Sequence, residues 1–556
     1  MSPASALVLC AYNSTAATCA KDYVLHSLKT PEWEVILGGI GMFFMAFATG
    51  ANDVANTMGN LVGCKVLPVH QALLVGGIAD FLGAISLGYS FKDSVSVKVG
   101  NLFMPHEDRV NACWHTGYTN SLQYEYANGM LAALFSGAAF VLIATALRMP
   151  VSTTHAVICG VIGMTLLNVG SSCFNLSVQN GIFSIVLSWV LGPLFAGIVS
   201  VIAYHFTTRF ILNSSSPRYR ALLFLPWFYA LGVFSVAVII FSKSRLLADL
   251  SQAPAYQDNL TYISVGAGAG LGIFVAVVVS IFLVPYVRGL CPSFANAAQM
   301  QTDAKLPTVS PFAPCTELGV REYTALTSLQ FANLLHLKGG DDYVYALGDD
   351  QINAVGRTSM ELIADAYCLT DEQIDAHFAM KYALLFASIL GSFLHGATDV
   401  GNSTIPMQAI WTIAKESYEV NATTGLLQPN AFTSWNAPYW LYVVAGVGGF
   451  LGINLFGKPV LDTLARGLTI VNVHRGFCME MGTIITLALA NVLGLPVSST
   501  YCAVSSVVCV SLAHYGREHF EGRKMVFVVL SWILTLPVSM GLAAGIAAIL
   551  NAALKQ

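Results

Sequence analysis

Long apolar runs separated by short polar stretches recur along most of the chain. The hydrocarbon core of a bilayer is about 30 Å thick, so a helix needs roughly 20 mostly apolar residues to cross it. On that measure, the predicted spans lie near residues 34–51, 69–90, 128–147, 155–171, 181–206, 221–243, 262–285, 380–414, 437–456, 476–494, 500–515 and 525–550. The pattern predicts an all-α polytopic membrane protein with about 12 transmembrane helices.

One stretch between the two groups of spans has a different pattern. It contains charged side chains such as Asp341, Asp349 and Glu361 but no long apolar run, which is typical of a soluble loop. We therefore divide the chain into an N-terminal segment 1–33, a first membrane half 34–285, a soluble loop 286–379 and a second membrane half 380–556.

Composition excludes other classes of protein. Of the 556 residues, 55% are apolar and 10% are charged, whereas charged residues make up about 25% of a soluble protein. The chain has a net charge of −4 and carries neither a basic tract nor zinc-type Cys/His spacing. We expect a lipid bilayer and no nucleic acid among its partners.

A polar motif interrupts the first apolar run and returns in the second half. The sequence Gly-Ala-Asn-Asp-Val-Ala-Asn over 50–56 is matched by Gly-Ala-Thr-Asp-Val-Gly-Asn over 396–402. An ionisable side chain costs a few kcal/mol at the centre of a bilayer, so Asp53 and Asp399 are candidates for a functional site. The alternative is a structural aspartate satisfied in a cavity, which does not explain why the motif occurs twice.

A second motif is also duplicated. Pro-Val-Ser-Thr-Thr-His over 150–155 is matched by Pro-Val-Ser-Ser-Thr-Tyr over 496–501. Proline and Ser/Thr favour the first turn of a helix, and the free N–H groups there attract anions. Two such helix starts could bind one anion between them; alternatively, their hydroxyl groups only cap helices. A Ser/His nucleophile at Ser152 and His155 lacks an orienting acid nearby.

The two copies lie on opposite sides of an odd number of predicted spans. Seven spans precede the second copy, so the copies enter the membrane from opposite faces. This predicts two inverted-topology repeats, with broken helices or hairpins at the midplane, as in many secondary transporters. The copies differ in their acidic residues, because Asp80 aligns with Gly449 and Glu480 aligns with Leu134.

Basic residues in the short loops predict the orientation. Lys and Arg favour the cytoplasmic side, and they gather in the loops around Arg218, Arg466 and Lys524. This distribution places 1–33 outside the cell, 286–379 in the cytoplasm and both termini outside, although basic residues in the outer loop 91–127 count against it.

The duplicated motifs, Asp80 and the lead-in Arg475-Gly476-Phe477-x-x-Glu480 resemble the inorganic phosphate transporter (PiT) family over roughly 34–205 and 380–550. The resemblance implies cation-coupled uptake of phosphate, usually driven by sodium in eukaryotic members. It also implies a required glutamate at Glu480, a large cytoplasmic loop, a homodimer and location in the plasma membrane. Thr398 and Tyr501 depart from the Asn and His of the family motifs.

The charges of the motifs suggest how phosphate and sodium could share one site. Carboxylates would repel an anion unless cations neutralised them, and hard cations prefer oxygen ligands. The predicted phosphate ligands are Asp53, Asn56, Ser152, Thr153, Thr154, Asp399, Asn402, Ser498, Ser499 and Thr500. The predicted sodium ligands are Asn52, Asp53, Asp80, Asp399, Asn402 and Glu480. We expect no cofactor other than sodium as the coupling ion.

Other functions stay open at this point. A proton-coupled phosphate or oxyanion symporter could use Glu480 or Asp80 for the proton. An intramembrane aspartyl protease could use Asp53 and Asp399 as an acid/base pair, but it would not need repeated Ser/Thr motifs. The chain has no GxxxxGK[ST] motif for ATP. We therefore expect a transporter driven by an ion gradient and not an enzyme.

Overall fold

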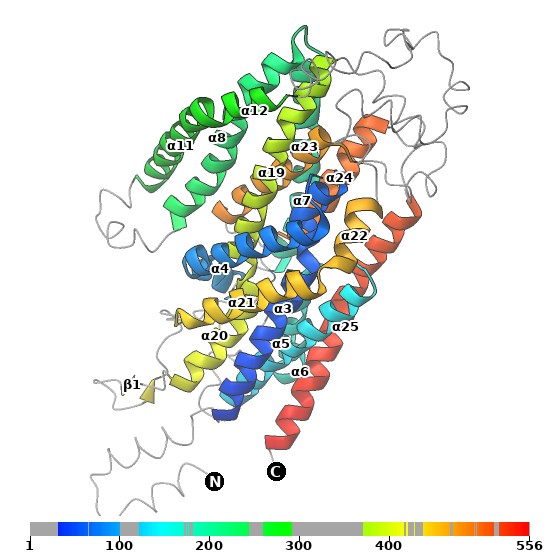
Figure 1. Ribbon diagram of the computed structural model, residues 1–556. Coiled ribbons are helices and arrows are strands. Elements are labelled where there is room, and N and C mark those ends of the chain that lie inside the picture. Colours follow the sequence, from blue (N-terminus) through cyan, green and yellow to red (C-terminus); the bar gives the residue numbers. More distant parts are fainter. Residues whose placement is uncertain are drawn as a thin grey trace, which may run out of the picture.

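The structure is a computed structural model of the chain (Figure 1). It describes residues 32–64, 66–100, 122–171, 174, 176, 182–243, 259–291, 371–415, 419–420, 427–428, 438–467, 471–493, 495, 497–515 and 522–554. The predicted N-terminal segment and most of the predicted loop 286–379 lie outside the described residues.

Helices form almost all of the described structure. Those of the first half are α3 (Glu32–Gly63), α4 (Val69–Gly100), α5 (Leu122–Ala146), α6 (Thr153–Asn168), α7 (Ile182–Thr207), η3 (Thr208–Leu212), α8 (Pro217–Lys243), α11 (Leu260–Val278), η5 (Val279–Leu283) and α12 (Val284–Leu290). Those of the second half are α19 (Asp371–Asp399), α20 (Gly401–Lys415), α21 (Trp440–Phe456), α22 (Lys458–Gly467), α23 (Val473–Val492), α24 (Ser499–Tyr515) and α25 (Gly522–Leu554). Two-residue strands, β1 (Glu419–Val420) and β2 (Leu427–Gln428), pair antiparallel.

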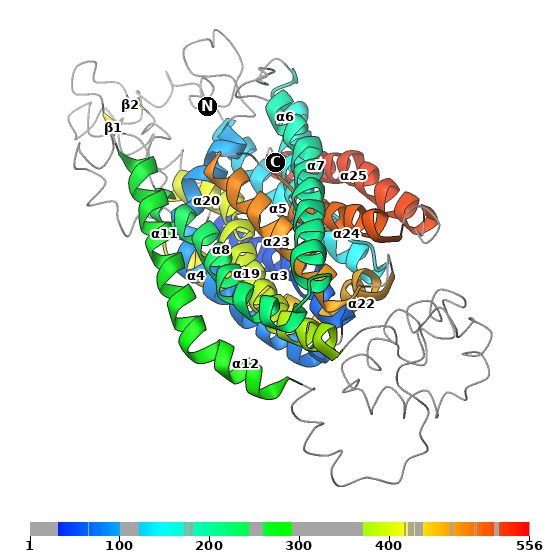
Figure 2. The same ribbon diagram turned by 90° about the horizontal axis from the view of Figure 1, so that it is seen from above.

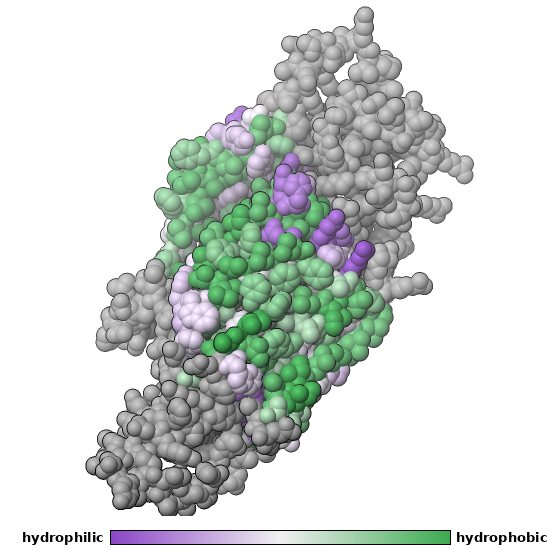
Figure 3. Space-filling view, turned by 60° about the horizontal axis from the view of Figure 1, so that its bottom comes forward, coloured by the Kyte–Doolittle hydropathy of each residue, from purple (hydrophilic) through white to green (hydrophobic). Residues whose placement is uncertain are grey.

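The all-helical prediction is confirmed, and a helix covers each of the predicted spans. Eight helices of the described part are long and apolar enough to cross a membrane, and three shorter apolar helices are α6, α21 and α24. Large apolar side chains such as Val190, Ile202 and Phe274 are exposed on the outside of the bundle, and Figure 3 shows a mainly hydrophobic face. These features indicate a multi-pass membrane protein; the number of crossings stays a prediction.

The helices of the two halves interleave. α3 of the first half packs against α21 of the second half, and α19 of the second half packs against α4 of the first half. Likewise α7 packs against α24, and α25 packs against α6. Seen from above, α11 and α12 form one edge of the bundle and α25 lies across from them (Figure 2). The motif-bearing helices α3, α19 and α23 lie between these edges.

Glycines allow two of these helix pairs to touch through their backbones. A methyl group at Gly50 would overlap the carbonyl of Gly449, and one at Gly452 would overlap the carbonyl of Phe47. The other pair makes the equivalent contacts, because Gly396 meets the carbonyl of Asp80 and Gly83 meets that of Phe393. The contacts correspond under the alignment of the two copies. They are what two symmetry-related halves would make, although the inverted topology itself stays a prediction.

The expected break in the first copy is wrong. α3 continues as one helix through the motif to Gly63, because every residue of the motif after Gly50 can adopt helical dihedrals. The second copy does break: α19 ends at Asp399 and α20 begins at Gly401. Gly401 replaces Ala55 at the break, and Gly costs a helix about 1 kcal/mol relative to Ala.

The backbone contact at Gly83 gives a test of the packing. Gly83→Ala should destabilise the folded protein by about 1–3 kcal/mol, because the added methyl group must push α4 away from the Phe393 carbonyl of α19. Thermal unfolding in detergent measures the effect. Gly39→Ala on α3 is the matched control, since a methyl group there meets nothing within 4 Å. Equal melting temperatures for the two variants would contradict the close packing.

Candidate functional site

Asp53 and Asp399 meet in the interior of the bundle. Asp53 lies in the middle of α3 and is fully buried, and Asp399 is the last residue of α19. The side chain of His395 joins them: its Nε2 lies 3.5 Å from Asp53 Oδ2 and 3.1 Å from Asp399 Oδ2. Ligand atoms of these three residues lie within 4.8 Å of one another, which is close enough to surround one cation.

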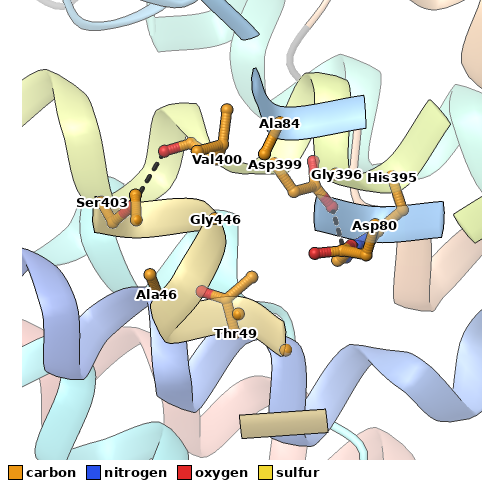
Figure 4. Close-up of a pocket in the computed structure, with 13 residues that line it drawn as sticks. Ala46, Thr49, Asp80, Ala84, His395, Gly396, Asp399, Val400, Ser403 and Gly446 are labelled. Atoms are coloured by element: carbon orange, nitrogen blue, oxygen red, sulfur yellow. Dashed lines mark hydrogen bonds and ion pairs between the residues drawn. The ribbon is translucent and has the colours of Figure 1, made fainter. Parts of the chain in front are cut away.

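Asp80 belongs to the same cluster. His395 Nδ1 lies 2.6 Å from Asp80 Oδ1, so both ring nitrogens of His395 face carboxylate oxygens (Figure 4). A neutral ring donates from only one of these nitrogens, and a protonated carboxyl group would then have to donate to the other. Donation from both nitrogens requires the imidazolium form. His395 thus lies among three carboxylates from α3, α4 and α19.

Sequence reasoning missed His395. It precedes the second motif directly and occupies the position of Thr49 in the first copy. A histidine next to a duplicated intramembrane aspartate was the signal that could have identified it, since ionisable residues at membrane depth are rarely accidental.

The Ser/Thr motifs reach the two aspartates in equivalent ways. Thr153 Oγ1 donates to Asp53 Oδ2 at 2.8 Å. At the equivalent position of the second copy, Ser499 Oγ donates to Asp399 Oδ2 at 2.9 Å. Thr500 Oγ1 also lies 2.9 Å from Asp53 Oδ1 and 3.2 Å from the carbonyl of Val151. The structure therefore brings together the duplicated motifs that the sequence singled out.

The last asparagine of each aspartate motif, Asn56 or Asn402, hydrogen-bonds to a Ser/Thr motif of the other half. Asn56 Nδ2 donates to Thr500 Oγ1 at 2.9 Å, and Asn402 Nδ2 lies 3.2 Å from both Thr153 Oγ1 and Thr154 Oγ1. Asn56 Oδ1 is buried and has no hydrogen-bond partner within the described part of the chain. The site is thus built from both halves together.

The first serine of each motif caps a helix. Ser152 Oγ accepts from the N–H of His155, and Ser498 Oγ accepts from the N–H of Tyr501, both at 3.3 Å. The predicted helix starts are therefore correct: α6 begins at Thr153 and α24 at Ser499. The capping leaves the hydroxyl hydrogen of each serine available, so binding of an anion by Ser152 and Ser498 stays a prediction.

Two predicted sodium ligands have other contacts. Asn52 Nδ2 lies 3.0 Å from both Thr145 Oγ1 and the Met149 carbonyl, and its Oδ1 accepts from the N–H of Val151. Asn52 therefore fixes the segment that leads into α6. Glu480 on α23 is buried and accepts from Asn60 Nδ2 at 2.9 Å. Asn60 lies two helical turns, about 10 Å, beyond Asp53, so Glu480 is outside the aspartate cluster.

A small pocket borders the cluster on its other side. Asp80, His395 and Asp399 form part of its wall, and the rest consists of small residues such as Ala46, Gly446 and Ser403 (Figure 4). The wall comes from α3, α4, α19, α20 and α21. Asp80 and Asp399 thus line the pocket, whereas Asp53 and Asp399 accept from hydroxyl groups at the N-termini of α6 and α24. The first environment suits a cation and the second suits an anion.

Comparisons with known proteins agree with this chemistry. The model of the phosphate transporter family matches residues 49–543. A putative phosphate permease of Pyrococcus horikoshii is 25% identical over 512 residues, which cover 92% of this chain and 96% of the permease. Sodium-dependent phosphate transporter 1-A of Danio rerio is 24% identical, with 93% of this chain and 94% of that protein covered.

A solved structure has the same fold. The structure titled "The sodium-dependent phosphate transporter" matches with a TM-score of 0.63 and 24% identity, and the match covers 93% of this chain and 99% of that one. At this level of identity the match shows the fold alone.

The contacts of Asn52 give a stability test. Asn52→Ala should lower the free energy of unfolding by about 1–3 kcal/mol, because the buried N–H of Val151 loses its acceptor. Thermal unfolding of the purified protein measures this loss. Asn454→Ala is the matched control, since Asn454 Nδ2 donates only to a carbonyl of its own helix, Phe450 O. If Asn52→Ala were as stable as the control, Asn52 would not hold the segment before α6.

Proposed function

The chain belongs to the phosphate transporter family, and from this membership we propose that it is a secondary active transporter that moves inorganic phosphate together with sodium. It is a transporter and not an enzyme, which removes the protease alternative. The observation that carries the proposal is the convergence of Asp53 and Asp399 with Thr153, Ser499 and Thr500.

Phosphate would bind on the hydroxyl side of the site. The donors there are the Ser/Thr groups of 152–154 and 498–500, the amides of Asn56 and Asn402, and the N-termini of α6 and α24. Neutral donors and helix N-termini can bind a multiply charged oxyanion without adding a fixed positive charge. Asp53 and Asp399 would in addition accept a hydrogen bond from a protonated phosphate oxygen.

Sodium would bind at the carboxylates. Asp53, Asp80 and Asp399 supply oxygen ligands, with Asn402 and Asn52 close by and Glu480 further along the bundle. A bound sodium ion would neutralise carboxylates that otherwise repel phosphate in a medium of low dielectric constant. Sodium and phosphate would then raise each other's affinity by the same factor, and this reciprocity couples them. Sodium would also compete with His395 for the oxygens of Asp53 and Asp399.

A proton-coupled carrier is the second candidate. His395 and Glu480 are buried groups able to carry a proton, and they lie beside or near the predicted ion site. The family includes relatives named only phosphate permease, so the name of the family does not decide the ion.

We further propose that the protein lies in the plasma membrane with both termini outside the cell and that it forms a dimer. The orientation rests on the basic residues of the loops, and the membrane and the dimer rest on family resemblance.

Transport by the purified protein in liposomes tests the coupling ion. With labelled phosphate outside, an inward sodium gradient at equal pH should drive accumulation above the equilibrium level. An inward proton gradient without sodium should not, because phosphate affinity depends on sodium at the carboxylates. Empty liposomes serve as the control. Accumulation driven only by the proton gradient would replace sodium coupling with the proton-coupled alternative.

Removal of either aspartate charge tests the site. Asp53→Asn and Asp399→Asn should each reduce sodium-driven uptake at least ~100-fold, because an amide supplies no charge to hold the cation, and a lost charged ligand costs about 3 kcal/mol or more. Initial uptake rates, normalised to the amount of folded protein in the membrane, measure this. Asp462→Asn on α22, away from the site, is the matched control. Near-normal uptake by either site variant would refute the assignment.

A further inference from the structure

One face of α3 carries polar side chains from the central site towards one end of the bundle. After Asp53 come Asn56, Thr57, Asn60 and Cys64, at the spacings of three, four, seven and eleven residues that place side chains on the same face of a helix. The face leads to the end of α3 at Gly63, and the segment before α23 lies against the next residue, Cys64.

Partners on other helices line this polar face. Thr57 Oγ1 accepts from Ser392 Oγ on α19 at 2.7 Å, and Asn60 donates to Glu480 on α23. Cys64 lies against the Val471 carbonyl just before α23, with Sγ 3.6 Å from the oxygen. We call this polar face of α3 and its partners the track. Its polar groups hydrogen-bond to one another in this structure, and they can exchange these bonds for bonds to water or to an ion.

Basic and aromatic side chains gather where the track ends. We call His377, His474, Arg475, His514 and Tyr204 the basic cluster. Arg475 is 1% exposed and lies in the first turn of α23, whose N-cap is Asn472. It directly follows His474 in the chain, and His474 contacts the rings of Tyr204 and His377. A permanently charged guanidinium and a helix N-terminus both favour an anion.

The other members of the cluster surround this charge. The ring of Tyr204 stacks on His474 with centroids 5.7 Å apart, and His377 meets His474 edge-on at 5.3 Å. Tyr204 Oη lies 2.8 Å from His514 Nδ1, and His514 is exposed. The cluster therefore extends from the surface of the protein to the buried Arg475.

His474 has a nitrogen available for a ligand. Its Nε2 lies 3.4 Å from Thr208 Oγ1, whereas its Nδ1 is buried and has no hydrogen-bond partner among the residues that the structure describes. His474 is itself only 4% exposed. A buried polar atom without a partner costs free energy unless a ligand or water satisfies it.

Among the described residues, the first half lacks counterparts to the charged members of this polar face. Glu480 aligns with Leu134, Arg475 with Gly129, Asn60 with Pro406 and Cys64 with Ile410. Ser403, the counterpart of Thr57, donates to a carbonyl of its own chain segment as Thr57 does, but Ser392, the partner of Thr57 on α19, aligns with Ala46, which has no hydroxyl group. Asn128 and Asn168, which align with His474 and His514, hydrogen-bond to Asn551 instead, so the equivalent end carries neutral amides where this end carries the basic cluster. Neither cavity filling nor helix packing requires such a difference between halves.

We propose that the basic cluster is a second, weaker site for inorganic phosphate, through which the transported ion passes at the end of the bundle that bears α23. This inference rests on the proposed function. Phosphate moving along α3 passes Glu480 on α23, and Arg475 lies about one and a half turns beyond it on the same helix, where its charge attracts the anion. Arg475 can bind two phosphate oxygens at once, and His474 can donate to a third.

Direct binding measures the second site without any transport. Purified wild-type protein, dialysed against labelled inorganic phosphate in the millimolar range with sodium present, should bind close to two phosphates per chain. Arg475→Gln should bind close to one, because the weaker site loses its charge. Arg475→Lys keeps a charge but loses the two-pronged geometry, so it should weaken the second site by ~10-fold without abolishing it.

Side-specific kinetics measure the role of the site in transport. In inside-out vesicles and in whole cells, Arg475→Gln should raise the half-saturating phosphate concentration ~10-fold at the face that bears the cluster. At the opposite face it should change less than twofold. Arg220→Gln is the matched control, since Arg220 lies at the same end but donates to the Phe210 carbonyl outside the cluster; both faces should then behave as in wild type.

The outcomes separate this inference from the proposed function. Unchanged binding and unchanged half-saturation at both faces for folded Arg475→Gln would overturn the second site, while sodium-driven uptake by wild type would stand. If Arg475→Gln fails to fold, His474→Gln serves instead, and the same readouts apply to it. Two bound phosphates in wild type and one in the variant, without any uptake by wild type, would support the cluster and refute the transport function.

Discussion

The structure depends on keeping several carboxylates in an apolar interior. Asp53, Asp80 and Asp399 come from three helices and meet around His395, and each unpaired charge there would cost several kcal/mol. The hydroxyl groups of Thr153, Ser499 and Thr500 stabilise two of these carboxylates. The helices therefore have to approach closely, which explains why their crossings use glycine. The duplicated motifs, the small residues at the helix crossings and the packing of the two halves against each other all help to bury these carboxylates.

Sequence reasoning identified the helices and the duplicated motifs because both follow from local pattern. The lengths of the apolar runs predicted the membrane spans, and the two Pro-Val-Ser motifs predicted the starts of α6 and α24. It failed where the outcome depends on tertiary contacts. The continuity of α3 could not be inferred from a polar motif that is equally compatible with a helix, and the position of Glu480 beside Asn60 depends on how α23 packs. The position of His395 beside the second motif was a signal in the sequence, but its contacts with three carboxylates depend on tertiary packing.

The two halves keep a common framework but differ in polarity. Equivalent residues make equivalent contacts at the aspartates, as with Thr153 and Ser499. The charged residues beyond the aspartates are not equivalent, because the first half places Leu134 where the second has Glu480. A shared framework would let the two halves contact an ion in equivalent ways, whereas unequal flanking residues make the surroundings of the two halves energetically different. Duplication supplies the first property, and later divergence of the flanking residues supplies the second.

The interleaving of the halves has a consequence for biogenesis. Gly50 touches Gly449, and Gly83 touches Phe393, so the contacts that complete the core join residues roughly 300 to 400 positions apart in the chain. Such contacts form late, because the loop that they close must first be synthesised and ordered. The first half therefore leaves the ribosome with Asp53 and Asp80 still lacking His395. It has to wait in the membrane, shielded by water, lipid headgroups or a chaperone, until the second half arrives.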